Sequence, residues 1–471
     1  MNGNFKKYVM LLPVVIAIIF AFLFGIWIGT NKKPPLTMRE PGADRPPGRQ
    51  NVSATKDPLK AVELVKGSGV PTSIKGEWTM FRGANRDNIS RSHSQLLRLW
   101  DKEGPKKLWQ IEVGEGYAGP VVKDGRVYLM DYDRENKKDA LRCLSLEDGK
   151  EIWRLTYPVV VKRNHGLTRT VPALNDKYVV AMGPKCHVVC ADRISGEFKW
   201  GIDLVKEYGA TVPQWYAGQC PLIISNTLIL APGGKDALLI AVDCDTGRVK
   251  WKTPNPDNWL MTHSSIVPAE FAGKRMYVYC AKLGVVGISA DDGSILWKFP
   301  EWKISIATVP SPLPIGDGKI FFTGGYGAGS VMVQLKEENG KFDVQKVFKL
   351  EPTVFGATQH TPIFYNNHIF GVRADGQFVC ITTEGKVVWT SSPKNQYGLG
   401  PFLLADDLFY VLAETGKLSL IQADTTEFKL LSQAKVFDAN EAWGPMALVD
   451  GRLLLRDYTT LICLQVGEPA Q

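Results

Sequence analysis

A short stretch that ends on tryptophan recurs along this 471-residue chain and restricts the folds that it can adopt. Each copy is a polar–glycine turn that opens a strand-forming run. The copies are Asp148–Trp153, Ser195–Trp200, Thr246–Trp251, Asp292–Trp297 and Glu384–Trp389. The gaps between successive tryptophans are 47, 51 and 46 residues across the first four copies. A period of this length in β-type sequence is typical of a propeller or a solenoid.

A second marker recurs with nearly the same period. A proline, usually preceded by a small or β-branched residue, opens each new unit, where its missing N–H costs no ladder hydrogen bond at the first position of a strand. The eight markers are Pro120, Pro172, Pro221, Pro268, Pro310, Pro362, Pro401 and Pro445. Each unit reads as four strands, as a propeller blade requires. Two units lack the tryptophan and end instead at Val347–Phe348 and Lys429–Leu431.

The two ends of the repeat array are complementary. The last unit, from Gly444 to Val466, has only three strands, whereas Leu108–Val113 is a strand without the turn that precedes its equivalents. We therefore expect Leu108–Val113 to complete the last blade and close the ring. The sequence predicts an all-β, eight-bladed β-propeller of four-stranded antiparallel blades over residues 76–467, followed by a short C-terminal tail, 468–471.

The N-terminal region predicts a membrane anchor. Residues 8–31 contain no charged side chain over 24 positions, and about 20 apolar residues suffice to cross a bilayer. A cleaved signal peptide is the alternative, but the run exceeds a signal h-region and no small-x-small site follows it. We expect a short tail over 1–7, a transmembrane helix over 8–31 and a flexible linker over 32–75 with a short helix around Pro58–Val65.

The location of the charge excludes one class of partner and complicates the orientation. The net charge is +8, but residues 1–75 carry eleven Lys or Arg against four Asp or Glu, so the remaining chain is close to neutral. A nucleic-acid partner is therefore not expected. Lys6 and Lys7 precede the predicted span whereas five basic residues follow it, which taken alone favours a cytoplasmic propeller.

The eight cysteines predict buried thiols. They are Cys143, Cys186, Cys190, Cys220, Cys244, Cys280, Cys380 and Cys463. An even number in an exported protein is compatible with disulfides. Most of these cysteines, however, lie within apolar strands at similar places in different units, so they point at their own interfaces and act as small apolar residues.

Candidate ligand-binding residues precede the marker prolines. The first strand of each propeller blade lines the central channel, so the residues before it ring one mouth of that channel. The candidates are Tyr117, Arg169, Trp215, Tyr216, His263, His360, Tyr397 and Trp443, together with Tyr326 from a neighbouring glycine-rich turn. Aromatic rings with one Arg and two His could form a ligand site. The alternative is that these side chains fill the hole and satisfy one another.

Motifs that would identify a reaction are missing from the sequence. Cys186, His187 and Cys190 share one strand, but His187 points away from the two cysteines, so no metal site is predicted. No Gly-x-Ser-x-Gly elbow, Walker loop or dinucleotide fingerprint lies in a suitable context. The glycine-rich Gly324–Gly329 lies between strands and indicates a loop. Catalytic residues remain unknown.

The repeat, as in Val242–Trp251 and Val189–Trp200, resembles that of the PQQ-like (quinoprotein-type) β-propeller superfamily. The opening Trp78–Asp87 is similar to that of single-propeller, BamB-like exported bacterial members. The resemblance covers about residues 78–466 and implies that tryptophans dock neighbouring blades by stacking on backbone turns. The docking residues would be Trp109, Trp153, Trp200, Trp251, Trp297 and Trp389.

The resemblance implies two classes of function. One is a quinoprotein dehydrogenase that oxidises alcohols or sugars with PQQ and Ca²⁺, but the chain has no adjacent cysteine pair and no set of residues that matches the calcium ligands and base. The other is a non-catalytic scaffold. We expect a membrane-tethered, monomeric binding scaffold of the cell envelope with protein partners or a small ligand. Because members of the superfamily are exported, we expect the propeller on the periplasmic side.

Overall fold

The computed structural model describes residues 17–26, 57–91 and 94–468. The chain divides into two compact units, residues 1–51 and 52–471. Residues 17–26 form a helix in the first unit. Within the described ranges no helix has the length and apolar character needed to cross a membrane. The rest of the predicted span 8–31, the tail 1–7 and linker residues 32–56 lie outside these ranges, so the anchor stays a prediction.

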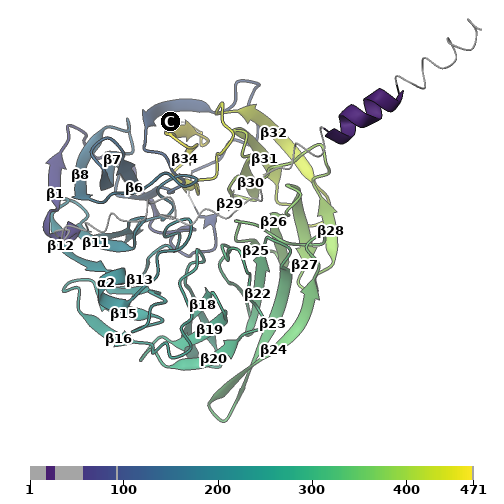
Figure 1. The fold of residues 1–471 in the computed structure, drawn as a ribbon. Helices are drawn as coiled ribbons and strands as arrows, with labels where there is room; N and C mark the ends of the chain where they lie inside the picture. The colour runs from purple at the N-terminus through teal and green to yellow at the C-terminus, as the bar shows by residue number, and fades with distance from the viewer. Residues whose placement is uncertain (1–16, 27–56, 92–93, 469–471) are drawn as a thin grey trace, which may run out of the picture. The chain divides into compact units, whose positions relative to one another are not determined.

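The second unit is a ring of eight antiparallel sheets, which confirms the predicted eight-bladed propeller (Figure 1). In each sheet the chain runs from a strand near the channel to a strand at the rim. The first two blades comprise β5 (Val121–Lys123), β6 (Arg126–Asp133), β7 (Lys138–Ser145) and β8 (Glu151–Pro158), then β9 (Ala173–Leu174), β10 (Tyr178–Met182), β11 (His187–Asp192) and β12 (Phe198–Asp203). A short helix, α2 (Leu204–Tyr208), follows β12.

The next three blades continue the same order around the ring. They comprise β13 (Leu222–Ile224), β14 (Thr227–Leu230), β15 (Ile240–Asp243) and β16 (Val249–Lys252); β17 (Val267–Phe271), β18 (Lys274–Ala281), β19 (Gly284–Ser289) and β20 (Ile295–Phe299); and β21 (Leu313–Gly316), β22 (Lys319–Gly324), β23 (Gly329–Glu338) and β24 (Lys341–Leu350). The long β23–β24 hairpin projects beyond the rim (Figure 1).

The last three blades lead back to the start of the ring. They comprise β25 (Ile363–Tyr365), β26 (His368–Val372), β27 (Phe378–Thr382) and β28 (Val387–Thr390); β29 (Phe402–Ala405), β30 (Leu408–Leu412), β31 (Lys417–Gln422) and β32 (Lys429–Lys435); and β33 (Ala447–Val449), β34 (Arg452–Arg456) and β35 (Thr460–Gln465), completed by β4 (Lys106–Glu112). The predicted strand Leu108–Val113 is thus β4, and it closes the ring by pairing antiparallel with β35.

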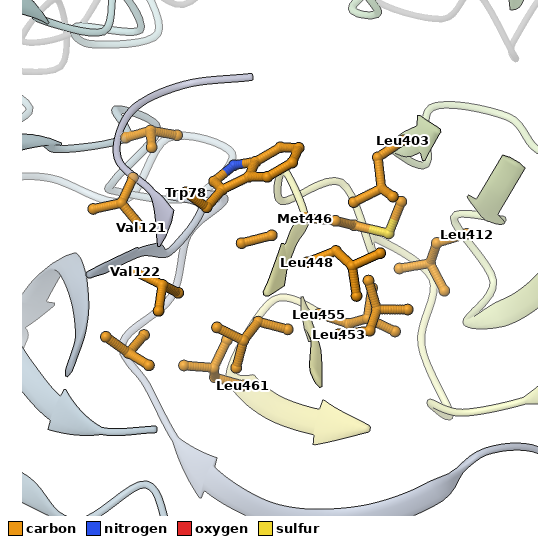
Figure 2. Close-up of a cluster of buried hydrophobic side chains, with 14 of the residues drawn as sticks. Trp78, Val121, Val122, Leu403, Leu412, Met446, Leu448, Leu453, Leu455 and Leu461 are labelled. Atoms are coloured by element: carbon orange, nitrogen blue, oxygen red, sulfur yellow. The ribbon is translucent and has the colours of Figure 1, made fainter. Parts of the chain in front are cut away.

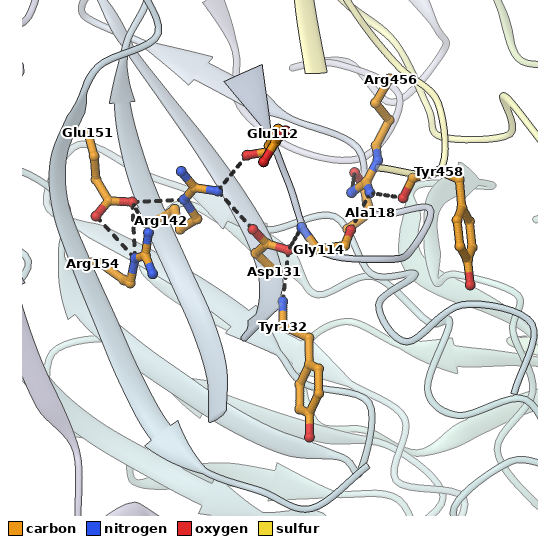
Figure 3. Close-up of polar contacts among 10 residues, drawn as sticks. All are labelled: Glu112, Gly114, Ala118, Asp131, Tyr132, Arg142, Glu151, Arg154, Arg456 and Tyr458. Carbon is orange, nitrogen blue, oxygen red and sulfur yellow. Dashed lines mark hydrogen bonds and ion pairs between the residues drawn. The ribbon is translucent and has the colours of Figure 1, made fainter. Parts of the chain in front are cut away.

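The seam between the last and first blades contains an apolar cluster and, separately, a buried arginine that is held by hydrogen bonds. Figure 2 shows leucines of β34 and β35 packed between Val121 and Val122 of β5 and Leu403 of β29, with Trp78 above them. The fully buried Arg456 donates to the carbonyl oxygens of Gly114, Ala118 and Tyr458 (Figure 3). Its Nε also donates to the carbonyl oxygen of Asp457. The planar guanidinium of Arg456 thus binds carbonyl oxygens from both the first and the last part of the ring, which fixes the geometry of its closure.

A second arginine extends this network into the first blade. Arg142 of β7 forms ion pairs with Asp131 at 2.9 Å and with Glu151 at 2.8 Å (Figure 3). Asp131 in turn accepts hydrogen bonds from the backbone N–H groups of Gly114 and Tyr132. These charges are largely buried but fully paired, which is the condition under which a buried ion pair does not destabilise its surroundings.

The glycine-to-tryptophan stretch has a definite role at the rim. A Cβ atom added to Gly149, Gly196, Gly247 or Gly293 would lie within 3 Å of the indole of the preceding blade, and all four glycines have positive φ. The four indoles belong to Trp109, Trp153, Trp200 and Trp251. Each tryptophan therefore lies flat on the turn of the next blade, where a side chain would prevent the contact.

The cysteines at equivalent places are explained by strand register. A small residue on the third strand of a blade faces the tryptophan on the fourth. The pairs are Cys143–Trp153, Cys190–Trp200, Ala241–Trp251, Gly287–Trp297, Cys380–Trp389 and Cys463–Trp109. All eight cysteines are buried and free. The four thiols that face a tryptophan, those of Cys143, Cys190, Cys380 and Cys463, therefore leave room for the large ring on the neighbouring strand.

Two predicted docking tryptophans depart from the simple pattern. Trp297 lies over Gly287 of its own blade, and its Nε1 donates to Met276 Sδ at 3.3 Å, because the next blade has the long β23–β24 hairpin instead of the usual turn. Trp389 reaches the next blade through a hydrogen bond from Nε1 to the Asp424 carbonyl oxygen at 2.9 Å. In the first of the two units without tryptophan, which ends at Val347–Phe348, Phe348 takes the place on Gly385.

Part of the predicted flexible linker is ordered. A single 3₁₀ turn, η1 (Pro58–Lys60), precedes β1 (Glu63–Lys66), which pairs antiparallel with β8 and adds a fifth strand outside the first blade. All four side chains of β1 are exposed, so no apolar alternation marks this strand in the sequence. Its pairing is determined by the open backbone edge of β8, and propensity rules do not detect such an edge.

Candidate functional site

The segment before the ring crosses the channel. β2 (Glu77–Trp78) pairs with β5 of the first blade, and β3 (Ile89–Ser90) pairs in parallel with β29 of the seventh. Between them, the Thr79 carbonyl accepts a hydrogen bond from Leu174 N of the second blade. These partners lie toward the last residues of the inner strands, so the segment, residues 77–90, covers the end of the channel opposite the predicted mouth. We call it the plug.

Arg82 anchors the plug from within. Its side chain is buried, and its guanidinium donates to the backbone carbonyls of Arg86, Asp87, Thr361 and Pro362. The last two belong to the approach to the sixth blade. Burial lowers the pKa of Arg82 to about 10, partly offset by the charge of Asp87. The guanidinium therefore connects the plug to the ring through neutral oxygens.

A cavity of about 350 Å³ lies above the plug, along the channel axis. Every blade contributes to its wall with residues that precede or begin an inner strand. The lining is Phe81, Arg82, Asn88, Tyr117, His165, Arg169, Trp215, Gly218, Cys220, His263, Ser265, Ala307, Val309, Tyr326, Thr358, Gln359, His360, Thr361, Leu399, Pro401, Phe402, Trp443, Pro445 and Met446. We call this cavity, which the plug closes at one end, the cup.

Seven of the nine candidate mouth residues line the cup. They are Tyr117, Arg169, Trp215, His263, Tyr326, His360 and Trp443. Tyr326 stands at the rim with 48% of its surface exposed. The other two candidates turn into the blades. Tyr216 donates to the Lys162 carbonyl oxygen at 2.6 Å, and Tyr397 packs against Phe378.

Sequence reasoning did not identify the floor of the cup. Phe81, Arg82 and Asn88 lie upstream of the first marker proline, in a segment recognised only as the beginning of the ordered region. The sequence signal that could have identified this segment is the polar and aromatic stretch Trp78–Asp87, which lies outside the repeat. The left-handed backbone of Arg82, Arg86 and Asn88, which non-glycine residues rarely adopt, marks the same segment as tightly constrained.

Aromatic contacts organise the wall on one side. The Tyr117 ring lies 4.9 Å from that of Trp443, and its hydroxyl donates to Glu441 Oε2 at 2.6 Å. Burial and the Glu441 carboxylate raise the pKa of Tyr117 well above its usual value, so the phenol stays protonated. Arg169 lies over the other part of the ring, with its guanidinium carbon 5.5 Å from the Tyr117 centroid.

His263 and His360 of the cup are neutral at physiological pH. Burial lowers the pKa of His263 to about 4, helped by the charge of Arg169. Burial also lowers the pKa of His360 to about 4, although a hydrogen bond of 2.7 Å between its Nε2 and the Gly400 carbonyl oxygen opposes the shift. The arginines are therefore the stable charges of the wall.

The lining does not fit PQQ with Ca²⁺. Calcium prefers carboxylate and carbonyl oxygens, and quinoprotein chemistry of the expected kind needs a carboxylate base. None of the described residues that line the cup is Asp or Glu. Across the described part of the chain, no group of three or more His, Cys, Asp or Glu side chains could hold a metal ion. No reaction step can be derived from this set of side chains.

Comparison with known proteins identifies the repeat. Residues 137–390, more than half of the chain, match the family PQQ_2, described as outer membrane protein assembly factor BamB. A serine/threonine-protein kinase, AfsK of Streptomyces griseus, is 27% identical over 188 residues, which is 38% of this chain and 21% of the kinase. The chain thus spans about a fifth of the length of that relative.

Solved structures share the fold at low identity. BamB from Moraxella catarrhalis superposes with a TM-score of 0.52 at 12% identity, over 77% of this chain and 100% of that one. The computationally designed protein Ika8 gives a TM-score of 0.51 at 12% identity with the same coverage. A quinohemoprotein alcohol dehydrogenase from Comamonas testosteroni has a TM-score of 0.45 at 15% identity, over 84% of this chain and 81% of that one.

Proposed function

The chain belongs to the PQQ_2 family, described as outer membrane protein assembly factor BamB, and on that basis we propose a non-catalytic scaffold of the cell envelope. Its propeller binds protein partners or a small ligand at the mouth of the channel. One observation carries the proposal: seven candidate residues from different blades converge on one cup, which the plug closes from the other side. Ligand sites are concave, mainly apolar and few per protein, and the cup meets that description.

Membrane attachment is a separate part of the proposal. The uncharged stretch 8–31 would anchor the chain in the membrane. In the ordered part of the linker, β1 pairs with β8 and so attaches the linker to the first blade. The propeller would lie on the periplasmic side, in keeping with a family named for outer-membrane assembly. A reporter enzyme fused after Gln471 should be active only outside the cytoplasm, and the chain should resist carbonate extraction from membranes. Activity confined to the cytoplasm would reverse the orientation.

Crosslinking from the mouth tests the binding function. A photoreactive amino acid in place of the exposed Tyr326 should give one discrete crosslinked species in intact cells. The matched control is the same amino acid at Val347 on β24, which is 52% exposed but lies away from the cup. Equal products from both positions, or none from Tyr326 together with no ligand found by thermal-shift screening, would contradict the proposal.

Cofactor retention tests whether the propeller is non-catalytic. After incubation with PQQ and Ca²⁺ and gel filtration, we expect no cofactor absorbance with the protein and no dye reduction with alcohols or aldoses. The physical reason is the absence of carboxylates among the described lining residues. Stoichiometric retention with turnover would replace the scaffold by a quinoprotein dehydrogenase.

A further inference from the structure

We propose that the cup binds a ligand that joins a flat apolar ring to a carboxylate, with Arg169 as the anion-binding group. The inference rests on the proposed binding function and specifies its ligand. Two sources share this chemistry: a free aromatic acid, and the C-terminal residue of a peptide that ends in an aromatic side chain. Both present the carboxylate next to the ring.

The charge of the cup favours an anion. Its described lining contains Arg82 and Arg169 but neither Asp nor Glu, and His263 and His360 are neutral. Nearby carboxylates are engaged elsewhere. Glu115 forms ion pairs with Arg134 at 2.8 Å and Arg163 at 3.1 Å. An anion that enters the cup therefore meets positive charge without a competing carboxylate on the wall.

The carboxylates behind the aromatic wall are also occupied. Glu441 accepts the hydroxyl of Tyr117, and Glu414 accepts hydrogen bonds from Trp443 Nε1 and Leu399 N, both at 3.2 Å. These carboxylates hold the aromatic rings in place from outside the lining. They orient the wall but do not neutralise Arg169, for which no carboxylate partner is found among the described residues.

The two arginines of the cup differ in how many guanidinium N–H groups remain free to bind a ligand. Arg82 uses Nε, Nη1 and both Nη2 hydrogens for carbonyl oxygens of the chain. Arg169 donates from Nη1 to the Gly166 carbonyl, and from Nη2 to the carbonyls of Asn164 and His165. Its Nε–H and one Nη1 hydrogen have no partner among the described residues. Arg169 can therefore bind a carboxylate oxygen, whereas Arg82 serves mainly to hold the plug.

The position of Arg169 is fixed before any ligand arrives. Three backbone carbonyls hold one end of the guanidinium, and the Tyr117 ring supports its face. Burial lowers its pKa to about 10, which still leaves the group charged at physiological pH. A preorganised arginine loses little side-chain entropy on binding, so its contact contributes directly to affinity.

The rest of the wall selects a ring. Trp215 and Trp443 stand on different blades, and Phe81 and Phe402 line the deeper part with the plug. The cavity of about 350 Å³ is near the lower end of the usual range for ligand sites, which favours a single ring system over a larger ligand. Aromatic faces gain most from a flat partner in offset or edge contact.

The test compares an acid with its neutral isostere on the full-length protein. Titration calorimetry would use phenylacetate against phenylacetamide, and a hexapeptide ending in Phe as free acid against the same peptide amide. We expect each acid to bind at least tenfold more tightly than its amide. Preference confined to the small acids identifies a free ligand, and preference confined to the peptides identifies a chain terminus. Equal affinity, or no binding of any acid at millimolar concentration, would overturn the inference.

Substitutions locate the effect. Arg169→Met should weaken binding of the acid at least tenfold and remove the difference between acid and amide, and Arg169→Lys should restore part of it. The control is Arg163→Gln, because Arg163 lies beside the mouth but is exposed and paired with Glu115. If Arg169→Met does not fold, the wild-type comparison decides, since the salt dependence of acid binding should exceed that of amide binding. Crosslinking at Tyr326 without acid preference would refute the ligand class and leave the binding function standing.

Discussion

The rim and the channel of the propeller differ in how far their residues recur from blade to blade. At the rim, one combination recurs: an indole faces a small residue across the strand pair and lies on the glycine turn of the next blade. At the mouth, the residues ahead of the marker prolines include Tyr117, Arg169, Trp215, His263 and Trp443, and they differ in both type and spacing from blade to blade. Repeated residues mark the contacts that every blade needs, and varied ones mark a site that only the whole ring forms.

The rim is also less uniform than its repeat suggests. Four blades use the indole-on-glycine contact, whereas Trp297 turns onto Gly287 and Phe348 replaces tryptophan on Gly385. Each departure keeps the local volume filled: Gly287 makes room for the ring above it, and Met332 faces the smaller Phe348. Packing density, and not the identity of the ring, is what the blade interface requires.

Removing a rim indole should have the largest effect on stability. Trp153 is fully buried, so Trp153→Ala should lower the free energy of unfolding by about 4 kcal/mol through lost burial and a cavity. The measurement is the urea midpoint followed by circular dichroism. The matched control is Trp215→Ala in the cup, where the ring faces open space and the cost should stay below about 1 kcal/mol. Equal losses would remove the distinction between rim and cup.

A buried carboxyl between the first two blades should make stability depend on pH. Burial raises the pKa of Asp139 to about 7, against smaller opposing effects of the Tyr157 hydroxyl and Lys185. A folded pKa above the unfolded one means that the stabilising contribution is complete below about pH 4 and is lost as the pH rises to 7. Asp139→Asn should thus stabilise the protein at pH 8, by up to about 4 kcal/mol, but not at pH 4.

Asp133 in the same blade provides the control for Asp139. Burial raises its pKa, but hydrogen bonds from Asn136 outweigh this and lower it below its usual value. Its contribution to stability is therefore present at neutral pH and lost as the pH falls. Urea midpoints for Asp133→Asn should change in the opposite direction across the same pH range, and parallel profiles for the two variants would contradict the assignment.

Filling a glycine under an indole should cost less than removing the indole. Gly247→Ala places a methyl group 2.7 Å from the Trp200 ring at a positive φ, and we expect a loss of about 3 kcal/mol. Gly340 separates the two causes, because its φ is also positive but no atom lies within 4 Å of an added Cβ. Gly340→Ala should cost about 1 kcal/mol by thermal unfolding. Similar losses at both sites would show that the indole contact contributes nothing.

Removing a rim-exposed residue of the cup should have the smallest effect on folding. Tyr326→Ala should change the melting temperature little, within about 0.5 kcal/mol of stability, because the side chain is half exposed and extends from a turn. The same variant should weaken binding of the aromatic acids. A stability loss without a binding change would assign Tyr326 to the fold.

The spacing of the marker prolines allowed part of the candidate site to be predicted from the sequence. Because each marker proline stands at the start of an inner strand, the residues just ahead of it must lie near one end of the channel, and six such candidates line the cup there, joined by Tyr326 from the turn between β22 and β23. Tyr216 follows Trp215 directly and faces the other way, into contact with Tyr132 and Leu167. Spacing predicts the end of the channel that a residue occupies, but not the direction in which its side chain points.

The sequence by itself determined the number of blades and the way in which the ring closes. Both depend on a period that is repeated eight times, and β4 completes the last sheet because its pattern is that of a fourth strand. Only the tertiary structure decided that the channel is closed at one end. The plug occurs once, and its contacts are backbone pairs and arginine–carbonyl bonds between residues far apart in the chain. Such contacts leave no periodic trace, because any open strand edge or carbonyl can accept them.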